Sequence, residues 1–211
     1  MATTERGLDR LIFFTDAVAA IAITLLILPL VDMVPEAAEK GQTVGEFLGD
    51  NSQQLLGFVI SFVVIARLWR VHHSIFEHVA RYNKTLITLT LAWSFTIVVL
   101  PLPTALISEL HVDRLSIAIY IGTMLVSSLV LSSISLVLRR NPSLEIATDQ
   151  LQQKSLVGNY LTSILFAAAL VLGVVFPVIN FWAILLVTLA GPLDRLTTRG
   201  RRTRTSGETG S

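Results

Sequence analysis

The chain has 211 residues, of which 53% are hydrophobic and 15% are charged, and its mean hydropathy is +0.69. Ordinary soluble domains are about 45–50% apolar, so this excess predicts a protein that faces lipid. Cysteine is absent, which excludes disulfides and thiolate metal sites. The formal net charge of +1 indicates no particular partner, whereas the positions of the charges are informative.

Long apolar runs separated by short charged stretches predict an all-α membrane protein with six transmembrane helices. Each crossing needs about 20 mainly apolar residues, and the last of the six runs is shorter than that. Residues 1–196 are expected to form one six-helix domain, followed by a basic tail at 197–211. The predicted spans are 11–31, 55–71, 86–107, 117–138, 156–178 and 181–193.

Lysine and arginine positions give the orientation of these spans. If the six spans alternate, 14 of the 16 basic residues fall on one side, and only Lys40 and Arg114 fall on the other. Positively charged loops stay in the cytoplasm, so both termini are predicted to be cytoplasmic. The asymmetry also supports the number of spans, because adding or removing one helix would mix the two sides.

Two alternatives concern the ends of the chain. Arg6 and Arg10 before an apolar run could belong to a signal peptide, but the run exceeds the about 7–15 residues of a signal core, which favours a transmembrane helix. The arginines between 199 and 204 could suggest nucleic-acid binding. We favour an anchor that stays in the cytoplasm and touches anionic lipid, and we expect no nucleic-acid partner.

Asp16 is a carboxylate several residues inside the first apolar helix, where an unpaired charge is costly. At 100° per residue it lies about 120° from Arg10 around the helix, so a bond between them is not expected. Partners on another helix are expected instead. Trp69 and His73, at the same predicted end of the second span, could supply one, although an aromatic belt explains them equally well.

The remaining polar residues of this second span do not predict catalysis. Arg67 and Arg70 are interpreted as snorkelling side chains. His72, His73 and His78 lack the i, i+4 spacing of a helical zinc site, so no metal site is predicted. The sequence contains no nucleophile motif and no glycine-rich phosphate loop, so neither an enzyme nor a cofactor is expected.

A stripe along the first helix could line a water path. Relative to Ile21, Ala17, Thr24 and Leu28 lie within about 60° around the helix, whereas Asp16 lies about 140° away. Any apolar helix has such a face, and contact with lipid explains the stripe as well as a pore does.

The first helix resembles a known family. The segment from Arg10 to Asp16 is similar to the Arg-x-x-x-Phe-Ser-Asp signature of the transmembrane protein 175 family, which comprises lysosomal potassium channels and prokaryotic relatives. Threonine replaces the serine of the signature and keeps its hydroxyl. The end of the second span and the six-helix layout extend the resemblance over the whole chain. The residues of the two motifs are Arg10, Phe14, Thr15, Asp16, Trp69, His72 and His73.

The resemblance implies a homotetramer in which the first helix of each subunit lines a central pore without a carbonyl filter. Ile21 would form the narrowest hydrophobic constriction, Thr24 a hydroxyl ring that influences potassium preference, and Leu28 a further ring. The motif residues would form a structural polar network that braces the pore helices, with Arg10, Asp16, Trp69 and His73 at its centre.

The segment 43–47, Thr-Val-Gly-Glu-Phe, is superficially similar to the Thr-Val-Gly-Tyr-Gly filter of ordinary potassium channels. It lacks the aromatic residue and the second glycine of that filter, and no pore helix precedes it, so an external loop is expected here. Acidic residues around it could concentrate cations at a pore mouth, or could simply be solvated. They are Asp32, Glu36, Glu39, Glu46 and Asp50.

The expected function is therefore passive, potassium-preferring conduction in the plasma membrane of a prokaryote, with potassium as the permeant ion. An ion-coupled secondary transporter or a proton pathway, with Asp16 titrating through His73, is the alternative. Transporters usually contain internal repeats and helices broken near mid-membrane. The sequence shows no convincing repeat, although Pro29 and the prolines at 101 and 103 could break helix ends.

Overall fold

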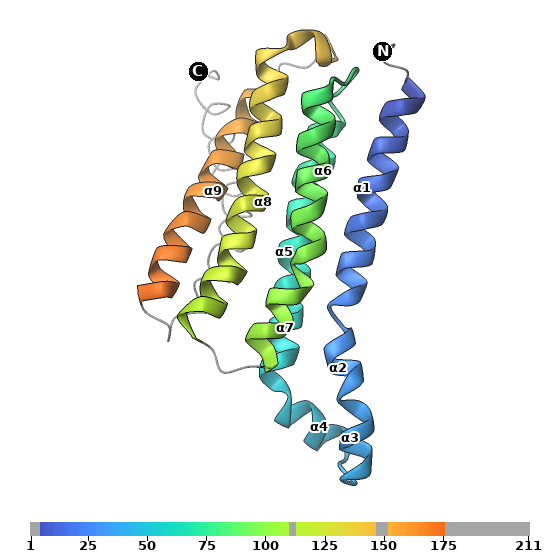
Figure 1. The fold of residues 1–211 in the computed structure, drawn as a ribbon, viewed down its shortest axis with the longest axis vertical. Helices are drawn as coiled ribbons and strands as arrows, with labels where there is room; N and C mark the ends of the chain where they lie inside the picture. The colour runs from blue at the N-terminus through green and yellow to red at the C-terminus, as the bar shows by residue number, and fades with distance from the viewer. Residues whose placement is uncertain (1–4, 110–112, 147–151, 176–211) are drawn as a thin grey trace, which may run out of the picture.

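The computed structural model describes residues 5–109, 113–146 and 152–175, and in this part of the chain the secondary structure is helical apart from one isolated β-bridge. The long helices run side by side in a bundle (Figure 1). The first lies at one edge of the bundle and the last at the opposite edge (Figure 1). These helices are α1 (Glu5–Leu25), α5 (Ser52–Phe76), α6 (Lys84–Val99), α8 (Arg114–Arg140) and α9 (Gln152–Val175).

Four helical stretches in the described residues are long and apolar enough to cross a membrane: Arg6–Glu39, Ser52–Phe76, Lys84–Glu109 and Arg114–Arg140. A fifth apolar helical stretch, Tyr160–Val175, is shorter. The all-helical, multi-pass architecture expected from the sequence is confirmed, and five predicted spans coincide with described helices. The sixth predicted span and the basic tail lie outside the described residues.

Proline divides two of the spans into consecutive helices. α2 (Leu28–Asp32) follows α1 with Pro29 in its first turn, and α7 (Pro101–Glu109) follows α6 in the same way. A proline lacks the backbone N–H that a continuous helix needs, but the first turn of a new helix tolerates it. The sequence correctly suggested breaks at these prolines.

Two short helices, α3 (Val34–Glu39) and α4 (Val44–Asp50), follow α2 at one end of the bundle (Figure 1). Thr43 begins α4 with a capping box: its Oγ1 accepts from the Glu46 N–H at 3.3 Å, and the Glu46 carboxylate accepts from the Thr43 N–H at 2.7 Å. The Thr43 N–H and the Thr43 hydroxyl both donate to the Glu46 carboxylate, and these two bonds lower the pKa of Glu46. The segment 43–47 therefore starts a helix, whereas the sequence predicted a loop.

At the other end of the bundle, the connection between α5 and α6 pairs with the segment that follows α8. A 3₁₀ helix, Pro142–Leu144, leads into an antiparallel bridge between Val79 and Glu145. The Ile146 N–H donates to the His78 carbonyl at 3.1 Å. This loop clasp connects residues that are far apart in sequence, and hydropathy gave no indication of it.

Interhelical hydrogen bonds supplement apolar packing in the interior. Trp93 and Tyr120 are among the largest fully buried side chains, and the Tyr120 hydroxyl lies 2.7 Å from the Ser61 hydroxyl. Thr104 donates to Ser61 at 3.0 Å, so one serine connects α5 with α7 and α8. In a membrane such bonds hold helices together because lipid offers polar groups no alternative partner.

Candidate pore helix and its brace

α1 has one face that is packed against the bundle. This face consists of small and apolar residues and one threonine, and it lies against α5 and α6. Small side chains allow membrane helices to approach closely. The face therefore fixes α1 to the rest of the bundle. Its buried residues are Leu8, Thr15, Ala19, Ala22 and Leu26.

The opposite face of α1 and its continuation in α2 contains the stripe predicted from the sequence. Ile21 is 59% exposed and Leu28 is 46% exposed, and Ala17 and Thr24 are exposed as well. The packing of the described helices leaves this apolar stripe uncovered, so in a membrane it must meet lipid, another protein chain or a pore.

Thr24 has a defined hydrogen-bond geometry on this face. Its Oγ1 donates to the Ile21 carbonyl, one turn earlier, at 2.8 Å. A hydroxyl has one proton and two acceptor lone pairs. Because the proton is used within the helix, the exposed oxygen can act only as an acceptor towards a group outside, such as a cation.

Asp16 accepts a hydrogen bond from a side chain of α5. The Trp69 indole Nε1–H donates to Asp16 Oδ1 at 2.8 Å, in a half-buried position. A hydrogen bond to an ionised carboxylate is stronger than one between neutral groups. The contact between Asp16 and Trp69, which the sequence left as one of two explanations, is present in the structure.

This contact continues along α5. The His73 ring stacks on Trp69 with a centroid distance of 5.4 Å and an interplanar angle of 27°. The His73 Nε2 in turn lies 3.6 Å from a Glu77 carboxylate oxygen. We call Asp16, Trp69, His73 and Glu77 the brace. Sequence reasoning did not include Glu77, although its i, i+4 spacing from His73 was a usable signal.

The other motif residues of α1 lie around the brace without joining it. Thr15 is fully buried and donates to the Ile12 carbonyl at 2.8 Å. Phe14 is 49% exposed on the same side as the predicted pore stripe. Arg10 is exposed, and among the described residues it has no recorded hydrogen bond or ion pair. The described part of the chain therefore does not bring Arg10 to Asp16.

His72 lies in a different environment from its neighbour His73. It is buried and stacks between Trp93, at a centroid distance of 4.1 Å, and Phe76, at 4.4 Å. Neither of its ring nitrogens has a hydrogen-bond partner in the part of the chain that the structure describes. His72 thus acts as an aromatic spacer between α5 and α6. The sequence grouped it with the polar network and gave no sign of this stacking.

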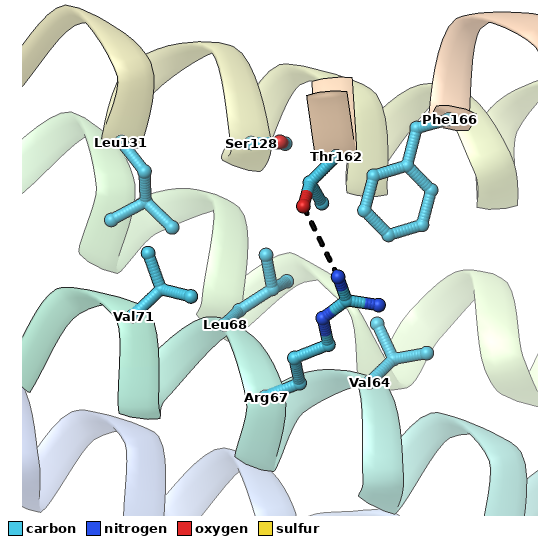
Figure 2. A pocket seen from close by; sticks show the side chains of 8 residues that line it. All are labelled: Val64, Arg67, Leu68, Val71, Ser128, Leu131, Thr162 and Phe166. Atoms are coloured by element: carbon cyan, nitrogen blue, oxygen red, sulfur yellow. Dashed lines mark hydrogen bonds between the residues drawn. The ribbon is translucent and has the colours of Figure 1, made fainter. Parts of the chain in front are cut away.

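Arg67 faces away from the brace. It lies two residues before Trp69, about 160° from it around α5, and its Nη2 donates to Thr162 Oγ1 on α9 at 3.1 Å (Figure 2). The half-buried guanidinium lines a crevice of about 10 Å³, enough for about one water molecule. The sequence predicted that Arg67 snorkels, and it gave no indication of this hydrogen bond between α5 and α9. The crevice is lined by Val64, Arg67, Leu68, Val71, Ser128, Leu131, Thr162 and Phe166 (Figure 2).

A larger, open cavity of about 420 Å³ lies near the proline breaks and α3. Its lining includes the carboxylates of Asp32, Glu36 and Glu109, and also Leu28 from the predicted pore stripe. Glu36 forms an ion pair with Lys40 at 2.6 Å. Over the described ranges, no group of three or more histidine, aspartate or glutamate side chains is arranged to hold a metal ion.

The fold and the brace thus define a multi-pass α-helical membrane protein whose first helix is fixed on one face and uncovered on the other. Residues 10–101 match the sequence model of the family described as endosomal/lysosomal potassium channel TMEM175. The matched residues are 92 of 211, less than half of the chain, and over them the chain is similar to a family of channels.

Individual relatives are similar to the chain over segments of comparable length. A potassium channel of Streptomyces collinus is 40% identical over 104 residues, which are 49% of this chain and 49% of that protein. The chicken endosomal/lysosomal proton channel TMEM175 is 37% identical over 106 residues, or 48% of this chain and 21% of that protein. The chain thus matches about half the length of the first relative and less of the second.

A solved structure extends the similarity beyond these segments. The crystal structure of a lysosomal potassium-selective channel TMEM175 homolog from Chamaesiphon minutus superposes with a TM-score of 0.74 at 23% sequence identity. The match covers 90% of this chain and 98% of that one. At this identity the similarity establishes a common fold.

Proposed function

We propose that this protein is a potassium-preferring cation channel that conducts passively through a central pore. Four copies of a six-helix subunit surround the pore, and α1 of each copy lines it. Both termini lie in the cytoplasm, and the membrane is the plasma membrane of a prokaryote. The names of the prokaryotic relatives, which are potassium channels, support the choice of ion.

The main observation in support of this proposal is that α1 has one packed face and one uncovered face. Its packed face and the bond from Trp69 to Asp16 hold the helix in its own subunit, whereas Ile21 and Leu28 remain uncovered. A helix that lines a shared pore needs this combination, because its pore face has no partner within one subunit. Lipid contact alone would not require a carboxylate brace inside the membrane.

The side chains on the uncovered face suit a hydrophobic gate with a polar ring beside it. Four Ile21 side chains around a narrow axis would expel water and block ions until the ring widens. Thr24 lies about one turn further along, and its oxygen can only accept because its proton is donated to the Ile21 carbonyl. Four such oxygens can replace part of the water around a potassium ion.

Ion flux into liposomes tests the proposal directly. Purified protein is reconstituted, and downhill uptake of potassium is compared with that of sodium for the wild type and for Thr24→Ala. We expect potassium-preferring flux that loses its preference in the variant. Flux that requires a proton gradient would indicate an ion-coupled transporter instead of a channel. Absence of flux for both ions would refute conduction.

Cysteine accessibility tests the pore face separately, because the chain has no cysteine of its own. Ile21→Cys and Leu28→Cys are expected to react with a charged, water-soluble thiol reagent in the reconstituted protein. Ile164→Cys is the matched control, since Ile164 is 63% exposed but lies on α9, at the opposite edge of the bundle (Figure 1). Equal reactivity at all three positions would contradict a pore lined by α1.

Proton conduction through the same pore is a second candidate, because the animal relatives are named as proton channels. A pH-sensitive dye inside the liposomes measures it, with the membrane potential set by a potassium gradient and an ionophore. Proton entry above that of protein-free liposomes, and reduced by a larger side chain at Ile21, would support this second activity. Entry equal to that of empty liposomes would exclude it.

A further inference from the structure

Four exposed cations gather at the end of the bundle that the loop clasp closes, where α8 ends and α6 begins (Figure 1). Two of them lie in the last turn of α8, four and five residues before Leu144. The Leu144 carbonyl accepts from the Arg81 N–H at 3.1 Å, and α6 begins three residues after Arg81. The backbone of the clasp thus brings two pairs of cations together. They are Arg81, Lys84, Arg139 and Arg140.

These cations have no partner among the described residues. The ion pairs there are Lys40 with Glu36 and His73 with Glu77, and neither includes one of the four. Their side chains also form no hydrogen bond with a described residue. The carboxylates beside the clasp are Glu77 and Glu145, so cations outnumber carboxylates here by four to two. Such an excess attracts an anion from outside the chain.

Both helices also have an exposed stripe that leads to one of these cations. On α6, exposed residues follow Lys84 every three or four positions and stay within about 40° of it around the helix. On α8, the exposed residues that precede Arg140 lie within the same angle. Phe95 is 69% exposed and Leu129 is 48% exposed, so the packing of α6 on α8 leaves both stripes uncovered. The stripes are Thr88, Leu91, Phe95 and Val98 on α6 and Val126, Leu129 and Ser133 on α8.

This arrangement matches the chemistry of a phospholipid. An apolar stripe in a membrane faces acyl chains, and a cation at its end lies at the level of the headgroups. Arginine pairs with a phosphate through two parallel N–H donors. The start of α6 adds backbone N–H groups and a partial positive charge. A zwitterionic headgroup compensates its phosphate with a cation of its own, so the net charge favours an anionic lipid.

We propose that the clasp end of α6 and α8 binds an anionic phospholipid, with its phosphate at Arg81, Lys84 and Arg140 and its acyl chains along the two stripes. The lipid connects the start of α6 to the end of α8 and so stabilises the clasp. Binding follows from the membrane class of the protein and goes beyond conduction. Only the leaflet, which is the cytoplasmic one, depends on the proposed topology.

Native mass spectrometry of the full-length protein, delipidated in detergent and titrated with phosphatidylglycerol, tests the headgroup site. We expect Arg81→Gln and Lys84→Gln each to weaken binding about fivefold, which is the attraction that one basic residue contributes near an anionic lipid surface. Arg114→Gln is the matched control. Arg114 is an exposed cation at the opposite end of α8, and its replacement should leave binding unchanged. Phosphatidylcholine with the same acyl chains should bind more weakly than phosphatidylglycerol.

Three outcomes would overturn the headgroup site. Equal affinity for the two lipids, or for the wild type and both variants, would mean that the cations only orient the helices. Displacement of the lipid by inorganic phosphate at matched ionic strength would assign the cations to a free anion. If the glutamine variants do not fold, titration of the wild type at rising salt decides. Salt screens the attraction between charges, so binding that does not weaken contradicts the proposal.

The position of the acyl chains is tested separately in nanodiscs, since the chain has no cysteine of its own. A fluorophore is attached at Phe95→Cys or at Leu129→Cys. Phosphatidylglycerol or phosphatidylcholine with nitroxide-labelled acyl chains is then added as a minor component to unlabelled phosphatidylcholine. We expect stronger quenching by the labelled phosphatidylglycerol at both positions, and loss of this difference in Lys84→Gln. Ile164→Cys on α9 is the control, and the two lipids should quench it equally.

Two results of the quenching experiment would overturn the proposal. Equal quenching by the two lipids at Phe95→Cys and Leu129→Cys would mean that the stripes meet only ordinary bilayer lipid. Absence of quenching there, with quenching at Ile164→Cys, would mean that another copy of the chain covers the stripes. Neither measurement uses ion flux, so failure of the lipid site and failure of the proposed conduction are distinguishable.

Discussion

Asp16 shows how one side chain is made acceptable inside a membrane helix. A carboxylate in hydrocarbon is costly unless a donor is supplied, and Trp69 supplies one from another helix. The indole is apolar apart from its single N–H, so it neutralises no charge and fills the space between α1 and α5. Placement of the donor on a neighbouring helix makes the position of α1 depend on this bond.

Replacement of Asp16 is therefore expected to affect assembly more than ion selection. Asp16→Asn keeps an acceptor for the indole but loses the charge, which should weaken the bond by about 1–2 kcal/mol. Size-exclusion chromatography and thermal unfolding should show a less stable oligomer with potassium preference retained. Asp9→Asn, an exposed substitution on the same helix, is the control. A normal oligomer with altered preference would contradict this prediction.

Ile21 is expected to control resting flux. Ile21→Ala and Ile21→Asn make the constriction wider or wetter, so dewetting becomes weaker and resting flux should rise severalfold in liposomes. Ile164→Ala, at an equally exposed position on α9, should leave flux at the wild-type level. If a folded Ile21 variant conducts like the wild type, Ile21 is not the gate.

At the scale of helices, α5 connects α1 with α9. Trp69 extends from it to α1, and Arg67 extends from nearly the opposite side to Thr162 on α9. Hydropathy identified the helix correctly but could not assign its polar residues to neighbours, because periodicity within one helix does not reveal which helix lies on each side. The snorkelling interpretation of Arg67 did not include the bond to Thr162 for that reason.

Because α8 packs closely on α9, we expect a larger side chain to destabilise the protein at one glycine and to be tolerated at another. A Cβ atom on Gly173 would lie 3.0 Å from Ile117 Cγ2 and 3.1 Å from Ile121 Cδ1, whereas a Cβ on Gly122 would meet no atom within 4 Å. Gly173→Leu should therefore destabilise the protein by about 1–3 kcal/mol through overpacking. Thermal unfolding in detergent measures this.

Gly122→Leu introduces the same side chain on α8 and is the control. It should leave stability unchanged or raise it, because leucine favours a helix over glycine. Equal destabilisation by the two substitutions would mean that the contact between α8 and α9 is looser than the structure indicates.

For the whole molecule, the apolar runs predicted the membrane class and the positions of the described spans, since length and hydropathy are properties of each segment alone. The stripe containing Ile21 and Thr24 was also predictable, because it needs only helical geometry. The stacking of His72 on Trp93 and the loop clasp were not predictable, because they depend on how separate segments meet. The constriction and selectivity roles of the stripe remain predictions.

The uncovered face of α1 predicts that the protein is stable only as an oligomer. Native mass spectrometry of the protein released from detergent should give a mass of four subunits. Ile21→Asp is expected to leave fewer tetramers, since four carboxylates would face one another on the axis and repel. A monomer that conducts ions would refute the central pore.

The loop clasp also has a consequence for how the chain is made. Val79 and Glu145 are about 65 positions apart, so at a synthesis rate of about 5–20 residues per second the first waits several seconds for the second. During that interval α8 must be threaded into the bilayer. Until the clasp closes, the early helices depend on their own contacts, among them the one between Trp69 and Asp16, and α9 is made only afterwards.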